Sequence, residues 1–495
     1  MSRASKGIMV AALVSLLAAP VAAQIETVTL PSANSPLVTV WLQFAVGSID
    51  DPPGKEGLAA LTANMVGQAG TAKRSYADLL DALYPMAANI QAGSDLEITA
   101  IGVTVHREKL AEAGALLQEA LLTPGFAESD FTRNKEQAKA FLTNTLPSND
   151  ELLGLAVLEK SIFKGHPYGH PSLGTVAGLA AITLDDVKAF YKQHYTRAHL
   201  TVGLAGGYPQ DYPGQLTAAL AALPAGQKRE RPLPAPAKVE GRQVTLVEKE
   251  TGAVGIQFGY SLPINRSHPD FYPLFVANNY LGDHRTFNGR LMQQLRGERG
   301  LNYGDYSYIE YWQAPPFTTD PNPGVPRRHQ YFSVWIRPVV PEDAQFALRA
   351  GLYEVERLRD RGLTKEEFEL TRDYLINRTK LWAQSQDDRL GFHMDSKFYG
   401  IPYFIDEIEK HLKAMTVEQV NAAVKKYIQT DNFVAVLVTN NAAALKAALE
   451  KDAPSPKTYG SQVAEAVLEA DKSIQGLKAK PARVDILPIA QVFQK

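Results

Sequence analysis

The 495-residue sequence lacks several features that would assign it to a common class. It contains no cysteine, which excludes disulfides and thiolate metal sites. Charged residues make up only 21% of the chain, the formal net charge is −2, and the absence of a basic cluster argues against nucleic-acid binding. It has no His-x-x-Glu-His sequence, no inverted form of it and no Gly-x-Ser-x-Gly elbow, so common hydrolase signatures are missing. Beyond residues 1–23, no apolar run reaches the roughly 18 residues that a membrane-spanning helix needs.

Residues 1–23 have the pattern of a secretory signal peptide. Arg3 and Lys6 form a basic start, an apolar stretch follows over residues 8–19, and small residues precede Gln24. We therefore expect cleavage before Gln24 and a soluble protein of the periplasm. The alternative is a buried N-terminal helix.

A proline-rich segment divides the rest of the chain into two halves with similar patterns. Residues 228–243 are expected to be an extended linker, because alternating prolines favour polyproline II. In each half a threonine, Thr183 or Thr416, stands at the expected start of a helix, and a β-rich run follows that helix. The predicted units are residues 24–227 and 244–455, with residues 456–495 as a packing tail.

Strands and helices alternate within each half. Residues 96–105 alternate apolar and polar side chains, which is typical of a strand with one buried and one wet face. Residues 109–122 and 366–384 are long amphipathic runs that would cover the buried face. The predicted fold class is α+β, with each half a mostly antiparallel sheet carrying helices on one face.

Five segments in order resemble the pitrilysin and mitochondrial processing peptidase (insulinase-like) family of zinc peptidases. They are residues 47–59 after a strand, Gly165–Pro171 with Leu173–Thr175, Thr183–Val187 through His194 and Tyr195, Arg290–Arg296, and Gly300–Tyr303. The resemblance implies two similar domains facing each other, with another pair supplied by a partner.

The resemblance also implies that the zinc site has been lost. In active members the helix after Gly-Leu-Ala reads His-x-x-Glu-His, whereas this chain has Ala60, Ala63 and Asn64 at the three positions. An alanine methyl cannot ligate zinc, and an amide is a poor substitute for imidazole. The family's third ligand, a Glu about 75 residues downstream, falls at residues 138–141, which contain no carboxylate; Glu136 is the nearest. No metal is therefore expected in this chain.

A second set of family positions is retained. Arg296 and Tyr303 match the spacing of the Arg/Tyr pair in the family's second domain, which reaches the substrate near the zinc. A guanidinium and a phenol donate hydrogen bonds and would bind a peptide carbonyl or the oxyanion formed from it. The alternative is structural, with the arginine capping a helix end and the tyrosine packed under a loop.

Other candidates are weaker. The histidines His166 and His170 lie in a proline- and glycine-containing loop, which argues against a helical zinc face. His194 and His199 flank a helix-to-strand turn and are expected to be structural. The acids near the vacated motif, Asp50, Asp51 and Glu56, have no histidine partner. Residues 303–312 alternate like a strand with an aromatic face, either core or cavity wall. The proline-rich insert 314–329 would brace a partner or a cavity rim.

Three functions fit these observations. The first is an exported, non-catalytic subunit of a heterodimeric zinc peptidase, in which a homologous partner carries zinc and this chain supplies Arg296 and Tyr303 for peptide substrates. The second is a pseudopeptidase that binds peptides or scaffolds an assembly without hydrolysis. The third, an active hydrolase with an unrelated site, has no supporting sequence signature.

Overall fold

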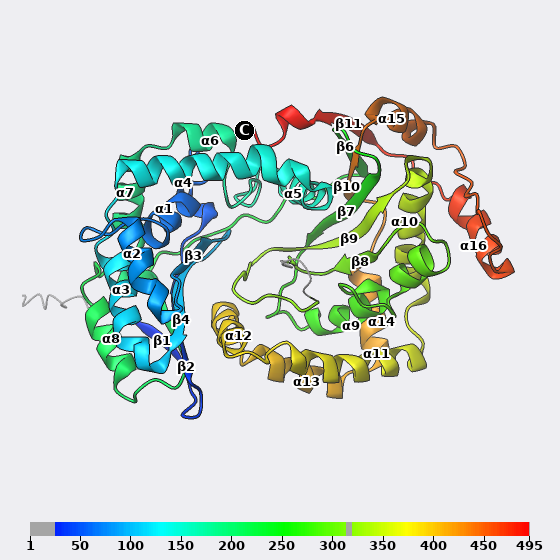
Figure 1. The fold of residues 1–495 in the computed structure, drawn as a ribbon. Helices are drawn as coiled ribbons and strands as arrows, with labels where there is room; N and C mark the ends of the chain where they lie inside the picture. Colours follow the sequence, from blue (N-terminus) through cyan, green and yellow to red (C-terminus); the bar gives the residue numbers. More distant parts are fainter. Residues whose placement is uncertain (1–24, 313–318, 495) are drawn as a thin grey trace, which may run out of the picture.

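The computed structural model describes residues 25–312 and 319–494 of the chain. The predicted signal peptide, residues 1–23, and the first residues of the proline-rich insert lie outside these ranges. The described chain forms two halves that lie side by side, each built on one β-sheet (Figure 1). No helix in these ranges is both long and apolar enough to cross a membrane.

The sheet of the first half has five strands. Its spatial order is β1 (Glu26–Pro31), β5 (Leu200–Gly206), β2 (Leu37–Phe44), β4 (Thr99–His106) and β3 (Gln91–Ser94). Only β1 and β5 are parallel, and the other neighbours are antiparallel. The outer side of this sheet carries α1 (Leu58–Gly67), α2 (Tyr76–Leu83), α3 (Leu110–Leu122), α4 (Glu128–Ala140), α7 (Leu184–His194) and α8 (Tyr212–Leu220) (Figure 1).

The sheet of the second half has six strands. Its order is β11 (Arg483–Pro488), β6 (Arg242–Glu248), β10 (Phe433–Thr439), β7 (Val254–Leu262), β9 (Gln330–Val339) and β8 (Asp305–Tyr308). The pairs β11–β6 and β6–β10 are parallel, and the rest are antiparallel. Helices of this half include α9 (Phe271–Gly282), α10 (Ala344–Arg361), α11 (Lys365–Arg378), α13 (Phe404–Ala414) and α14 (Val417–Tyr427).

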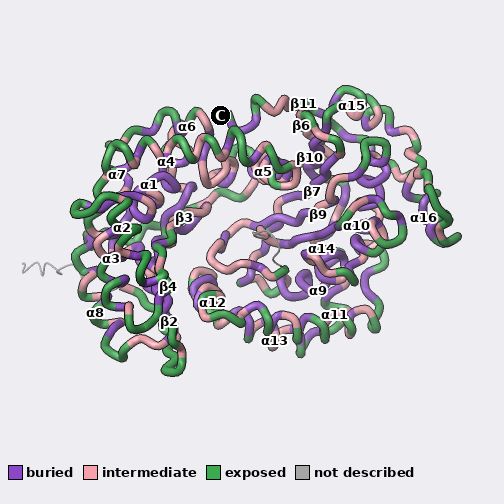
Figure 2. The backbone as a smooth tube through the Cα atoms, in the orientation of Figure 1, coloured by how far each residue is buried: buried purple, intermediate pink, exposed green. Residues whose placement is uncertain are grey.

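Two helices cross from one half to the other. From the first half, α5 (Asp150–Ile162) packs on β7 and β10, and from the second half, α12 (Gln386–Tyr399) packs on β5 and β1. As a result every residue of β10 is buried (Figure 2). Alternate side chains of this strand enter two different hydrophobic clusters. The expectation of one wet sheet face is therefore wrong for this strand, because a helix from the other half covers it.

The predicted helix starts are confirmed at both capping threonines. Thr183 accepts a hydrogen bond from the backbone N–H of Asp186, and Thr416 accepts one from that of Gln419. In each case the acidic or amide side chain bonds back to the backbone of the threonine, which completes a capping box.

The two halves are also joined by buried ion pairs and by the end of the described chain. Arg327, in the proline-rich insert, pairs with Asp95 and Glu159 of the first half. Residues beyond 455 form α16 (Glu465–Gly476) and strand β11, and then return to the first half. There the carbonyl of Phe493 accepts from the backbone N–H of Val176, and the Phe493 side chain is buried.

Candidate functional site

The helix that would carry the family's zinc motif is formed but holds no ligand side chains. Ala60 and Ala63 are buried in α1, and Asn64 is half-buried. The helix start is fixed instead by Asp51, whose two carboxylate oxygens accept from the backbone N–H groups of Gly57 and Ala59, each at 2.7 Å. Burial raises the pKa of Asp51 to about 8. The carboxylate is thus used as a helix cap.

The stretch that would supply the third ligand offers none either. Helix α4 ends at Ala140 and continues as a wide helical turn from Phe141 to Thr145. The Glu136 side chain is exposed and pairs with Lys139 at 2.9 Å. In the described ranges, no three His, Asp or Glu side chains are grouped so as to hold a metal ion. The donor set in this half therefore does not fit zinc.

The structure brings Arg296 and Tyr303 together. The guanidinium carbon of Arg296 lies 4.7 Å from the centroid of the Tyr303 ring and 5.4 Å from that of Phe287. Tyr303 is 70% exposed and Phe287 66% exposed, while Arg296 is half-buried. The nearest polar contact of the guanidinium within its own helix is the Met292 sulfur at 3.9 Å. The result is a cation stacked between two exposed aromatic rings.

The turn between the two residues explains the contact. Arg296 lies in a wide helical turn, Met292–Gly297, and the chain reverses at Gly300, whose φ is +59°. The backbone N–H of Leu301 then bonds to the carbonyl of Leu295 at 3.0 Å. A positive φ strongly favours glycine, so this residue ends the helix and returns Tyr303 to the side of Arg296.

Sequence patterns did not indicate the polar residues that lie around Arg296 and Tyr303. Asp305 is fully buried and accepts from the Asn302 amide at 2.6 Å, and burial raises its pKa to about 8. Arg337, on β9, lies 5.5 Å from the Tyr303 ring and pairs with Glu151 of the first half. No local signal could have placed Glu151 here, because it is 186 residues away from Arg337 in the chain.

The histidines are placed as structural residues. His166 accepts from the backbone N–H of Tyr168 and contacts the carbonyl of Pro234, and burial lowers its pKa. His194 and His199 are buried with stacked rings, and burial lowers the pKa of His194 to about 4.

The aromatic run is partly core and partly cavity wall. Only residues 305–308 form a strand, and Tyr306 and Tyr308 are buried within it. Tyr311 and Trp312 instead line a cavity of about 420 Å³ between the halves, together with residues of α5 and with Arg327. Arg327, in the proline-rich insert, therefore contributes to the lining of this cavity.

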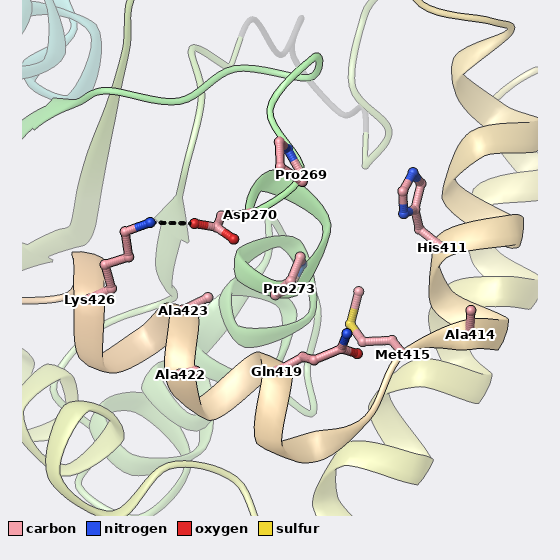
Figure 3. A pocket seen from close by; sticks show the side chains of 10 residues that line it. All are labelled: Pro269, Asp270, Pro273, His411, Ala414, Met415, Gln419, Ala422, Ala423 and Lys426. Carbon is pink, nitrogen blue, oxygen red and sulfur yellow. Dashed lines mark hydrogen bonds and ion pairs between the residues drawn. The ribbon is translucent and has the colours of Figure 1, made fainter.

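Two further hollows lie elsewhere on the molecule. A groove of about 400 Å³ follows β3, the edge strand of the first sheet. On the second half, a pocket of about 390 Å³ lies between α9, α13 and α14 (Figure 3). Its acid, Asp270, is bound to Lys426 and to the Tyr427 hydroxyl, each at 2.8 Å. The acid of this pocket is therefore already paired, and its histidine, His411, lies 3.5 Å from Glu407.

Comparisons with known proteins agree with this architecture. The model described as "Insulinase (Peptidase family M16)" matches residues 27–176, and the model described as "Peptidase M16 inactive domain" matches residues 181–375. The "Non-peptidase homolog YmxG" of Helicobacter pylori is 23% identical over 407 residues, which cover 82% of this chain and 89% of the relative.

Solved structures show the same fold. A peptidase M16 inactive domain from Pseudomonas fluorescens superposes with a TM-score of 0.73 at 24% identity, covering 83% of this chain and 94% of the other. A chain of Complex III2 from Candida albicans superposes with a TM-score of 0.67 at 16% identity, covering 84% and 94%. These matches confirm the predicted two-domain α+β fold.

Proposed function

Because the chain belongs to the M16 (insulinase) peptidase family and has none of that family's zinc-ligand residues in place, we propose that it is the non-catalytic subunit of a heterodimeric zinc peptidase. A homologous partner carries the zinc, and this chain supplies Arg296 and Tyr303 to a shared chamber for peptide substrates. The signal-peptide pattern over residues 1–23 supports export to the periplasm as part of the same proposal.

The observation that carries the proposal is the unpaired charge of Arg296. Among the described residues, no carboxylate forms an ion pair with it, and its contacts are two aromatic rings and a thioether. Buried arginines elsewhere in the chain are paired, as Arg327 is with Asp95 and Arg349 with Asp452. A guanidinium without a carboxylate partner keeps its donors available for a ligand oxygen.

The chemistry of the pair suits a peptide substrate. Both side chains donate hydrogen bonds, and the donors strengthen as negative charge develops on a carbonyl oxygen under attack. Stacking on Phe287 and Tyr303 restricts the guanidinium without neutralising it. Zinc in the partner would supply the activated water.

A second candidate function is peptide binding or scaffolding without hydrolysis. It is favoured by the groove along β3, which is an edge strand paired on one side only with β4. An edge strand can bind an extended peptide as an added strand. Likeness to a relative named as a non-peptidase homologue also favours it.

Co-expression separates the two candidates. This chain, with an affinity tag, is produced together with a homologue from the same source that retains His-x-x-Glu-His. We expect the homologue to co-purify with one zinc per pair, and peptide cleavage to require both chains. Cleavage by the homologue alone at the same rate, without retention on the tagged chain, would contradict the heterodimer. Binding of peptides by this chain alone, with no cleavage by any pair, would favour the second candidate.

A further inference from the structure

Tyr303 is held from both sides by one residue of the second sheet. The backbone N–H of Arg337 donates to the carbonyl of Gly304 at 3.1 Å, and its carbonyl accepts from the Asn302 side chain at 2.9 Å. The Arg337 guanidinium carbon also lies 5.5 Å from the centroid of the Tyr303 ring. Both chain neighbours of Tyr303 and its ring therefore contact the same arginine.

Space around this contact is tight. A Cβ added to Gly304 would lie 2.3 Å from the Tyr306 hydroxyl and 3.4 Å from Cδ of Arg337. The first distance is too short for a real Cβ, so a side chain at residue 304 would displace the Tyr306 hydroxyl, whereas the second is an ordinary van der Waals contact.

Arg337 is oriented in turn by the first half. Its Nε donates to the Glu151 carboxylate at 2.5 Å, and both side chains are largely shielded, with 29% and 24% exposed. Glu151 lies in the first turn of α5, which is capped by Asn149. The same turn is fixed to the second half by Asp150, which pairs with Lys249 at 2.5 Å and accepts from Thr251 at 2.6 Å.

From this chain of contacts we infer that Glu151 and Arg337 are positioning residues, which hold Tyr303 against Arg296 only when α5 of the first half is docked on the second sheet. The inference rests on the proposed function, because that proposal gives Tyr303 its role with the peptide substrate. Glu151 also neutralises Arg337. Arg296, by contrast, forms no ion pair with a carboxylate among the described residues. The arrangement of the pair in the second half thus depends on the half that has lost its zinc ligands.

The test uses the full chain without a partner. Position 303 carries 3-fluorotyrosine, which is observed by ¹⁹F NMR, and amide hydrogen exchange is measured over residues 301–305. Glu151→Gln and Arg337→Met should shift the fluorine resonance and speed exchange by about 10-fold, as loss of a shielded charged hydrogen bond predicts. Arg337→Lys, which keeps the cation, should restore most of the protection. Arg483→Met removes an exposed pair with Asp485 in β11, away from α5, and should change exchange by less than about 2-fold.

Two outcomes would overturn the inference: an unchanged resonance and unchanged exchange in both Glu151→Gln and Arg337→Met, or an equal change in Arg483→Met, which would indicate a general loosening of the chain. Thermal melting of each variant confirms that it is folded. The same variants are then assayed in the reconstituted pair. If Tyr303 is loosened while turnover is unchanged, the positioning role holds and the proposed catalytic use of Tyr303 fails.

Discussion

The guanidinium of Arg296 stacks on the ring of Tyr303, with 4.7 Å between the guanidinium carbon and the ring centroid. The two residues are seven positions apart and come from opposite sides of a glycine turn. Among the described residues no carboxylate forms an ion pair with Arg296, although its charge opposes the rise in the pKa of the buried Asp305, and the tyrosine stays exposed. This contact is the feature on which the proposed function depends, and the turn that creates it can be tested first.

Replacing Gly300 by alanine should destabilise the chain and disturb the pair. The residue has a φ of +59°, and a Cβ there would meet no other atom, so the cost comes from the backbone and is about 1 kcal/mol. Gly297 is a matched control because it lies in the helical turn without a positive φ, so Gly297→Ala should be neutral or slightly stabilising. Chemical denaturation of both variants measures the difference, and equal effects would contradict the explanation.

Replacing Asp305 by asparagine should flatten the pH dependence of stability. Burial raises the pKa of Asp305 to about 8, whereas the pKa of an aspartate in the unfolded chain is about 4. Between these values the folded state holds a proton that the unfolded state has lost, so the free energy of unfolding falls as pH rises through this window. Asp305→Asn should therefore match the parent near pH 4 and exceed its melting temperature near pH 9. A difference that is constant from pH 4 to pH 9 would contradict this.

Removing Arg327 should strongly destabilise the contact between the halves. Its side chain is 3% exposed, makes two hydrogen bonds to Asp95 at 2.9 and 3.0 Å, and also pairs with Glu159. Arg327→Met would leave two shielded carboxylates without their cation, at a cost of about 3–5 kcal/mol. The control Arg483→Met removes a solvent-exposed pair with Asp485 and should cost less than about 1 kcal/mol. Denaturant titration that gave similar losses for both would contradict the prediction.

The purified chain should contain no stoichiometric zinc. Restoring two histidines with Ala60→His and Asn64→His should still give weak binding, because the nearest downstream carboxylate, Glu136, is exposed and paired with Lys139. Elemental analysis after dialysis measures both proteins. One tightly held zinc per chain in the parent would refute the prediction.

Sequence patterns predicted the features that depend on local chemistry. The helix starts at Thr183 and Thr416 follow from a few neighbouring residues. The alternation over residues 96–105 placed a strand, but β4 begins only at Thr99, because Asp95 and Ile98 close a turn through their backbones. A period of two continues through such a turn and cannot mark its end.

Features that depend on distant residues were not predictable in this way. The crossing of α5 onto the opposite sheet covers one face of β10, and no local pattern in that strand shows that the covering helix comes from the other half. Likewise, the surroundings of Arg296 and Tyr303 depend on the ion pair between Arg337 and Glu151, which comes from the tertiary fold. No alternation or capping pattern specifies which distant charge a surface residue will meet.

Steady-state kinetics of the reconstituted pair test the central claim most directly. With a peptide substrate and a zinc-bearing homologue as partner, Arg296→Ala and Tyr303→Phe in this chain should each lower kcat by roughly 100-fold, because the donors act most strongly on the developing oxyanion. Gel filtration should show the pair still assembled. If kcat and KM are both unchanged in the two variants, Arg296 and Tyr303 are structural, and the account of this chain as a subunit that contributes to catalysis is contradicted.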